Sequence, residues 1–280
     1  MKNSFKWMSA AILICGLSFS IASCKKDPQP TPTPTPTPEP KPTTQTMLTG
    51  MMATGITLYD SVAYTYNYDD QYRLIRSEAH VRNDNYVIHD LLFAYSDDRI
   101  SVTGTEDGKP LTFECTLDDQ GRITHFVRTK VINDTITSIT NTDFTYDAEG
   151  HLASVYSISD NSSQGSNTIY VWEGDDLKAK NTEDGLITVD YLPSDAPAQA
   201  LFFSVGYDFE LEDLCAQGCF GKLPAHMPAQ RTVTTTLPVP GMDPLVVTAT
   251  FNYTVNAEGR LATCVETSGS TSYTFIWEDL

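Results

Sequence analysis

Four aspartate pairs are the most obvious candidates for acid–base chemistry or calcium binding in this sequence: Asp69-Asp70, Asp97-Asp98, Asp118-Asp119 and Asp175-Asp176. A glycosidase needs two carboxyl groups about 5–9.5 Å apart across a cleft. Neighbouring acids at the end of a strand point in different directions, and aspartate is itself a common turn residue. We therefore interpret these pairs as turn residues and predict no catalytic carboxylates.

Nucleophile, phosphate and metal motifs are the next class of chemistry to consider. The sequence has no nucleophile elbow, phosphate-binding glycine loop, HExxH pair or dinucleotide-binding glycine pattern. Its histidines are scattered, and only His80 and His89, across an expected hairpin, could approach one another. We therefore expect no cofactor, no metal site and no enzyme activity.

Aromatic side chains recur at the ends of expected strands, and they have two interpretations. Their flat faces and polar edges suit stacking on sugar rings in a groove. The alternative, which we favour, is that they form the core of a curled sheet. The residues concerned are Tyr66, Tyr68, Tyr95, Tyr146, Trp172 and Trp277.

Chemistry of another kind is indicated by a cysteine at the end of an apolar N-terminal run. Two lysines and an apolar stretch beginning at Trp7 are typical of an export signal. The stretch ends in Ile21-Ala22-Ser23-Cys24, which is similar to the lipobox of lipoprotein precursors. Cleavage after Ser23 would expose Cys24, which then carries diacylglycerol and acyl chains such as palmitate. We predict that residues 1–23 are a signal peptide and that Cys24 is the lipid anchor.

A proline-rich tether follows the cysteine over residues 24–46. Nearly every second residue from Pro28 to Pro42 is proline, so we expect extended polyproline II. At about 3.1 Å per residue this stretch would hold the folded domain, residues 47–280, roughly 45 Å from the lipid.

The acidic composition limits the choice of partners. The chain has 18 basic and 36 acidic residues, a net charge of −18, and loss of two lysines with the signal makes it −20. Such a surface repels nucleic acid and anionic lipid headgroups. We therefore expect a monomer that contacts the membrane only through its lipid and does not bind nucleic acid.

Four cysteines remain in the expected domain: Cys115, Cys215, Cys219 and Cys264. Export permits disulfides, but a domain of this size can bury a core without them. Their spacing forms neither a C-x-x-C redox motif nor a four-ligand zinc site. The sequence leaves their disulfide status open.

One hairpin phrase is repeated along the domain. It consists of an apolar or aromatic residue, a polar turn, then Arg or His and an aliphatic residue. The copies are Tyr68–Leu74, Leu117–Ile123, Tyr146–Leu152 and Val255–Leu261, with shorter forms at Tyr95–Ile100 and Trp172–Leu177. Asp or Asn starts each full turn, and glycine supplies the positive-φ position in three of them. We predict a mainly β domain, an antiparallel up-and-down meander of about 14 strands that curls into a sheet or barrel-like shell.

A single insertion of about residues 194–222 interrupts the meander. Ser194-Asp195 can begin one helix, and a second is expected from Asp208 to Gly218. A short helical insertion between strands of a curled sheet is expected to cover an open end or plug the interior.

The hairpin phrase loosely resembles the YD or Rhs repeats of large β-shells. The whole layout is more similar to Bacteroidetes lipoproteins, in particular to a family of unknown function with a porin-like fold. The features that carry this resemblance are the lipobox, the proline spacer, the hairpins, the helical insertion with its Gly221-Lys222 loop, and the terminal aromatic strand. It implies a curved antiparallel sheet or barrel and no known catalytic residues. In that group acids after the lipidated cysteine direct surface export, so Asp27 favours the cell surface over the periplasmic face of the outer membrane.

Two triplets, Asp60-Ser61-Val62 and Asp134-Thr135-Ile136, resemble the pattern used for O-glycosylation in exported Bacteroidetes proteins. We therefore predict Ser61 and Thr135 as modification sites.

These observations together predict an outer-membrane lipoprotein that binds a ligand, such as a glycan or an envelope protein, without catalysis. The alternatives are a hydrolase acting on a polysaccharide or cell-wall polymer, and a purely structural envelope protein.

Overall fold

The computed structural model describes residues 45–56, 59–84, 86–133, 136–192, 211–237, 242–268 and 271–280. The expected signal peptide, Cys24, nearly all of the tether, the first expected helix of the insertion, and Thr135 lie outside these residues.

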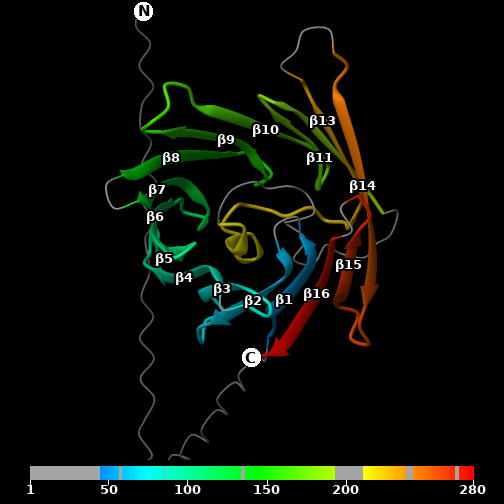
Figure 1. The fold of residues 1–280 in the computed structure, drawn as a ribbon, viewed down its shortest axis with the longest axis horizontal. Helices are drawn as coiled ribbons and strands as arrows, with labels where there is room; N and C mark the ends of the chain where they lie inside the picture. The colour runs from blue at the N-terminus through cyan, green and yellow to red at the C-terminus, as the bar shows by residue number, and fades with distance from the viewer. Residues whose placement is uncertain are drawn as a thin grey trace, which may run out of the picture. The chain divides into compact units, whose positions relative to one another are not determined.

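The domain is a closed antiparallel β-barrel in which every strand pairs with its neighbours in sequence, and β1 pairs with β16 (Figure 1). The described residues contain sixteen strands: β1 (Thr46–Ile56), β2 (Tyr59–Tyr68), β3 (Leu74–Val81), β4 (Val87–Tyr95), β5 (Arg99–Glu106), β6 (Lys109–Leu117), β7 (Ile123–Asn133), β8 (Ile136–Tyr146), β9 (Leu152–Ser159), β10 (Ser166–Glu173), β11 (Asp176–Thr182), β12 (Gly185–Tyr191), β13 (Pro228–Thr235), β14 (Leu245–Val255), β15 (Leu261–Glu266) and β16 (Thr271–Asp279).

The predicted β meander is confirmed, although the expected number of strands was about two too low. The sequence offered two shapes, a curled sheet and a barrel-like shell, and the described residues form the closed barrel. β1 contains Gly50 and Gly55 and belongs to no hairpin phrase, so local sequence patterns do not predict it. The final strand pairs with β1 from the other end of the chain, which no local pattern could indicate.

The repeated phrase folds into one recurring turn. In the turn between β6 and β7, Asp118 Oδ1 accepts the backbone N–H groups of Gln120 and Arg122, each at 2.9 Å. Asp69 and Asn256 accept the equivalent pairs in their own turns, and Asp147 accepts the N–H of His151. The Asp or Asn that starts each of these turns therefore accepts hydrogen bonds from backbone N–H groups, as expected for a turn residue.

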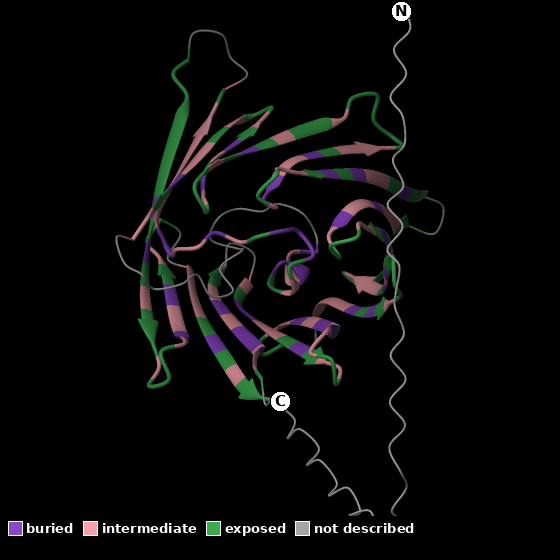
Figure 2. Cartoon of the chain, turned by 180° about the vertical axis from the view of Figure 1, so that it is seen from behind, coloured by how far each residue is buried: buried purple, intermediate pink, exposed green. Residues whose placement is uncertain are grey.

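Inward and outward residues alternate along the strands, as the bands of buried and exposed residues in Figure 2 show. On β14, Ala249 and Phe251 are buried inside, whereas Thr248, Thr250 and Asn252 are exposed outside. The outer face also carries paired charges, such as Arg76 with Asp90 at 2.9 Å and His125 with Asp143 at 2.8 Å. Apolar side chains are exposed there as well, among them Leu92, Val246 and Ile276.

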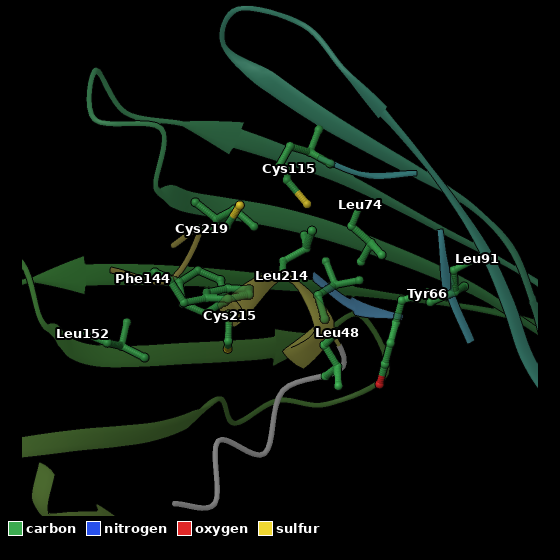
Figure 3. Packing of buried hydrophobic residues seen from close by; sticks show 14 of the residues in the cluster. Leu48, Tyr66, Leu74, Leu91, Cys115, Phe144, Leu152, Leu214, Cys215 and Cys219 are labelled. Atoms are coloured by element: carbon green, nitrogen blue, oxygen red, sulfur yellow. The ribbon is translucent and has the colours of Figure 1, made fainter. Parts of the chain in front are cut away.

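Residues 211–227, which we call the plug, connect β12 to β13 and lie inside the barrel (Figure 1). They begin with the 3₁₀ helix η1 (Glu212–Gln217), which ends at Gly218 with φ 74°. It lies within the second expected helix, Asp208 to Gly218, but is a short 3₁₀ helix. Figure 3 shows Leu214 and Cys215 of the plug among side chains of the barrel wall such as Leu74 and Phe144. The plug therefore supplies part of the core.

Backbone hydrogen bonds fix the plug to one end of the barrel. Ile123 N–H donates to the Cys219 carbonyl at 2.7 Å, and Lys222 N–H donates to the Gly150 carbonyl at 3.0 Å. These contacts involve the turns that precede β7 and β9, so the plug closes the end at which the repeated turns lie. We call this end the turn rim.

Two further features concern the described residues alone. All four cysteines are buried free thiols. No helix in the described part is long and apolar enough to cross a membrane.

We expect Gly221→Ala to reduce the free energy of unfolding by about 2–4 kcal/mol, because a methyl group there is strained and overpacked. Its carbon would lie 2.5 Å from the Gly150 carbonyl oxygen, at a backbone φ of 80°. Urea unfolding followed by tryptophan fluorescence measures the loss. Gly259→Ala is the matched control: its φ is 76° but nothing lies within 4 Å, so we expect a loss of about 1 kcal/mol. Equal losses would show that the plug does not approach Gly150 closely.

Candidate functional site

A belt of aromatic donors runs around the turn rim. Seven Tyr or Trp side chains near the ends of even-numbered strands each donate a hydrogen bond of 2.6–2.9 Å to a backbone carbonyl at or near the start of the preceding odd-numbered strand. The pairs are Tyr68 with Leu48, Tyr95 with Leu74, Tyr146 with Ile123, Trp172 with Leu152, Tyr191 with Leu177, Tyr253 with Pro228, and Trp277 with Leu261.

β-Bulges explain why these carbonyls need side-chain donors. The register shifts by one residue beside Leu74, Ile123, Leu152, Leu177 and Leu261, each of which starts or nearly starts its strand. A bulge locally disrupts the ladder of backbone hydrogen bonds. The aromatic donor from the next hairpin then bonds to the carbonyl, and buried carbonyls left without partners are costly.

The basic residue of each turn packs on the same belt. Arg122 lies over the Tyr146 ring at 4.2 Å, and Arg73 over Tyr95 at 4.8 Å. His151 stacks on Trp172 at 4.4 Å, taking the place that arginine occupies in sister turns. The Arg or His of the phrase therefore covers one aromatic face.

All six residues predicted to stack on a ligand thus have structural roles. Tyr66 is buried in the core, and the other five are partly buried against it. Ligand binding on their rings stays a prediction, and it now depends on which of them border open space.

A pocket at the turn rim brings two of them together. Tyr68 and Trp277 border a pocket of about 370 Å³, a size suited to a small ligand. Polar side chains complete it: Gln45, Thr46, Gln217 and Arg260. We call it the rim pocket. Its wall is formed by the start of β1, the ends of β2 and β16, the turn before β15, and the plug, so only the closed barrel assembles it.

Three polar residues from separate elements, one buried and two partly buried, resemble a catalytic triad in composition. Ser77 Oγ donates to Asp213 Oδ2 at 2.5 Å and lies 3.0 Å from His89 Nε2. In a Ser-His-Asp triad the histidine lies between the other two, whereas here serine does, and Ser77 is fully buried. We therefore interpret the three as a latch that holds the plug to β3 and β4.

Burial controls the ionisation of this latch. The Asp213 carboxyl lies deep inside the barrel, which raises its pKa, although Ser77, His89 and Tyr66 oppose the rise. Burial likewise lowers the pKa of His89. Neither Asp213 nor Ser77 stands in a motif, and they are far apart in the chain, so the sequence did not indicate them.

His80 and His89, the two histidines that could have approached one another, lie on adjacent strands. Ala79 pairs with His89, and His80 pairs with Val87, so the two histidine side chains point to opposite faces of the sheet. Among the described residues no cluster of His, Cys, Asp or Glu could hold a metal. Ser61 is buried in β2, so its modification would have to precede folding, and its glycosylation stays a prediction.

Comparisons with solved structures show the fold. A porin-like protein from Bacteroides uniformis superimposes with a TM-score of 0.60 at 14% identity, over 82% of this chain and 98% of that one. A porin-like protein from Bacteroides vulgatus gives 0.59 at 11% identity, over 84% and 100%. No protein-family model matches the sequence, and no curated protein matches it. The chain thus has the fold of the Bacteroides porin-like proteins, as the sequence resemblance predicted.

We expect Asp213→Asn to gain stability relative to wild type as the pH rises from 4 to 8. Because the pKa of the Asp213 carboxyl is raised in the folded state, its protonated form stabilises the fold. The wild type loses this stabilisation as the pH rises above the ordinary pKa of an aspartate, whereas Asn does not titrate. Urea unfolding at several pH values gives the difference between the two proteins. A difference that does not change with pH would mean that Asp213 titrates normally.

Proposed function

We propose that this chain is a non-catalytic lipoprotein of the outer membrane, exposed at the cell surface, that binds a glycan in the rim pocket. The observation that carries the binding role is the pairing of Tyr68 and Trp277 with amide and guanidinium donors around one pocket. Aromatic faces pack on the apolar faces of sugar rings, and the polar side chains can bond to the hydroxyls.

The composition of the pocket favours binding over hydrolysis. Its lining contains no aspartate or glutamate, whereas most glycosidases use two carboxyl groups around the scissile bond. The side chains that could donate to a sugar hydroxyl there are Gln45, Thr46, Gln217 and Arg260. They fit recognition of an uncharged polar ligand.

The proposed anchor enters at the same end of the barrel. Gln45, the first described residue, lies at the end of the tether and lines the rim pocket. A tether of roughly 45 Å lets the domain reach material outside the membrane while it stays attached.

Isothermal titration with neutral oligosaccharides, from cellotriose to chitotriose and lactose, tests the binding role. We expect at least one to bind and Trp277→Ala to weaken it about tenfold, because the ring loses its stacking contact. Product analysis of the same mixtures by chromatography should find no cleavage.

Trp172→Ala is the matched control. Trp172 makes the same bond to a bulge carbonyl, at 2.8 Å, and is equally half-buried, but it does not line the rim pocket. We expect it to unfold as easily as Trp277→Ala while binding like wild type. Equal loss of binding in both would assign the effect to stability, and turnover of any sugar would favour the hydrolase.

Cys24→Ala tests the anchor. The variant should lose incorporation of labelled palmitate and appear in the soluble fraction, because no acyl chains then hold it to the membrane. Protease treatment of intact cells, with the wild type still anchored, tests surface exposure. A Cys24→Ala protein that stays in the membrane fraction would contradict lipid anchoring.

A further inference from the structure

A second pocket lies at the turn rim. It has a volume of about 380 Å³ and is lined by Gln120, Arg122, Glu149, Gly150, Gly218, Gly221 and Lys222. We call it the glycine pocket. Gln217 and Leu223 line the rim pocket, whereas their chain neighbours Gly218 and Lys222 line the glycine pocket. The two pockets share no lining residue, but successive residues of the plug line one and then the other.

Two cationic side chains approach one point in the glycine pocket. A methyl group placed on Gly150 would lie 3.5 Å from Arg122 Nη1 and 3.9 Å from Lys222 Cε. At the sister positions Gly121 and Gly259 nothing lies within 4 Å, so this arrangement is specific to the turn before β9. Gly150 leaves free the space that the two side chains flank.

Both cations keep donors available. Arg122 uses Nε and Nη2 on Asp118, at 2.8 and 2.7 Å, and its stacking on Tyr146 fixes the guanidinium with Nη1 toward Gly150. Lys222 is exposed, and its ammonium pairs with no acid in the described part of the chain. Glu149 also lines the pocket and opposes an anion there.

We propose that the glycine pocket binds the acidic group of a glycan held at this end of the barrel. The inference rests on the proposed sugar-binding function and adds to it a substrate class, glycans with a carboxylate or sulfate. Arg122 supplies a fixed donor suited to oxyanions, and Lys222 supplies a mobile charge.

The charge of the domain limits how many acidic groups the ligand carries. Residues 45–280 contain 13 basic and 34 acidic residues, a net charge of −21. The negative domain would repel a polyanion along its whole length. A single acidic group in the pocket interacts mainly with the two nearby cations, because salt screens more distant charges. The site therefore selects a glycan with isolated acidic sugars over a densely charged one such as heparin.

Titration of the full mature domain with 3′-sialyllactose, lactose 3′-sulfate and the neutral 3′-galactosyllactose tests this. We expect the acidic probes to bind more tightly than the neutral one. Lys222→Gln should weaken only the acidic probes, about fivefold, and high salt should do the same, because an exposed charge contributes modestly and is screened. Glu149→Gln should strengthen them. The carboxylate and sulfate probes show which acid fits better.

Lys109→Gln is the matched control, since it removes an equal charge from an exposed lysine in the β5–β6 turn at the other end of the barrel. It should leave all three affinities unchanged. If Lys222→Gln leaves the acidic probes unaffected, or if only neutral sugars bind, the glycine pocket is not an acid site and the rim-pocket proposal stands. If no sugar of either kind binds, the proposed function itself is overturned.

Discussion

The fold depends on bonds between the aromatic belt and the bulge carbonyls. A closed sheet of this size must bend sharply where its strands turn, and bulges accommodate that bending by disturbing the ladder. Leu74, Ile123 and Leu261 each start a strand at such a bulge, and their carbonyls accept Tyr95, Tyr146 and Trp277 in turn. Each hairpin thus completes the hydrogen bonding of the one before it, which ties local turn chemistry to closure of the whole barrel.

Closure also solves the problem of exposed sheet edges. β1 and β16 would otherwise present unpaired N–H and C=O groups, which invite association with other chains. Their pairing removes both edges and brings residues from opposite ends of the chain together at the turn rim. The plug then adds the buried side chains of Leu211, Leu214 and Phe220 to the core at this end.

The candidate binding surface is a consequence of this plugged end. Turns, aromatic belt and plug meet there, and the two pockets form where the plug does not reach the wall. The belt serves two purposes at once: its polar edges bond to bulge carbonyls, and Tyr68 and Trp277 also line a pocket. A binding site built on such rings is held rigid by the fold, which favours recognition.

The sequence by itself determined the hairpins, the turn acids and the mainly β fold, because these follow from contacts between residues a few positions apart. The Asp118 and Asp147 turns could be predicted for that reason, and so could the position of Phe144 and Tyr146 on one face of their strand. The resemblance to porin-like lipoproteins also correctly indicated the shape. Tertiary structure alone decided the β1–β16 closure, the latch of Asp213 with Ser77, and the meeting of Tyr68 with Trp277. These pairs lie more than a hundred residues apart, so no local pattern encodes them, and only the completed barrel brings them into contact.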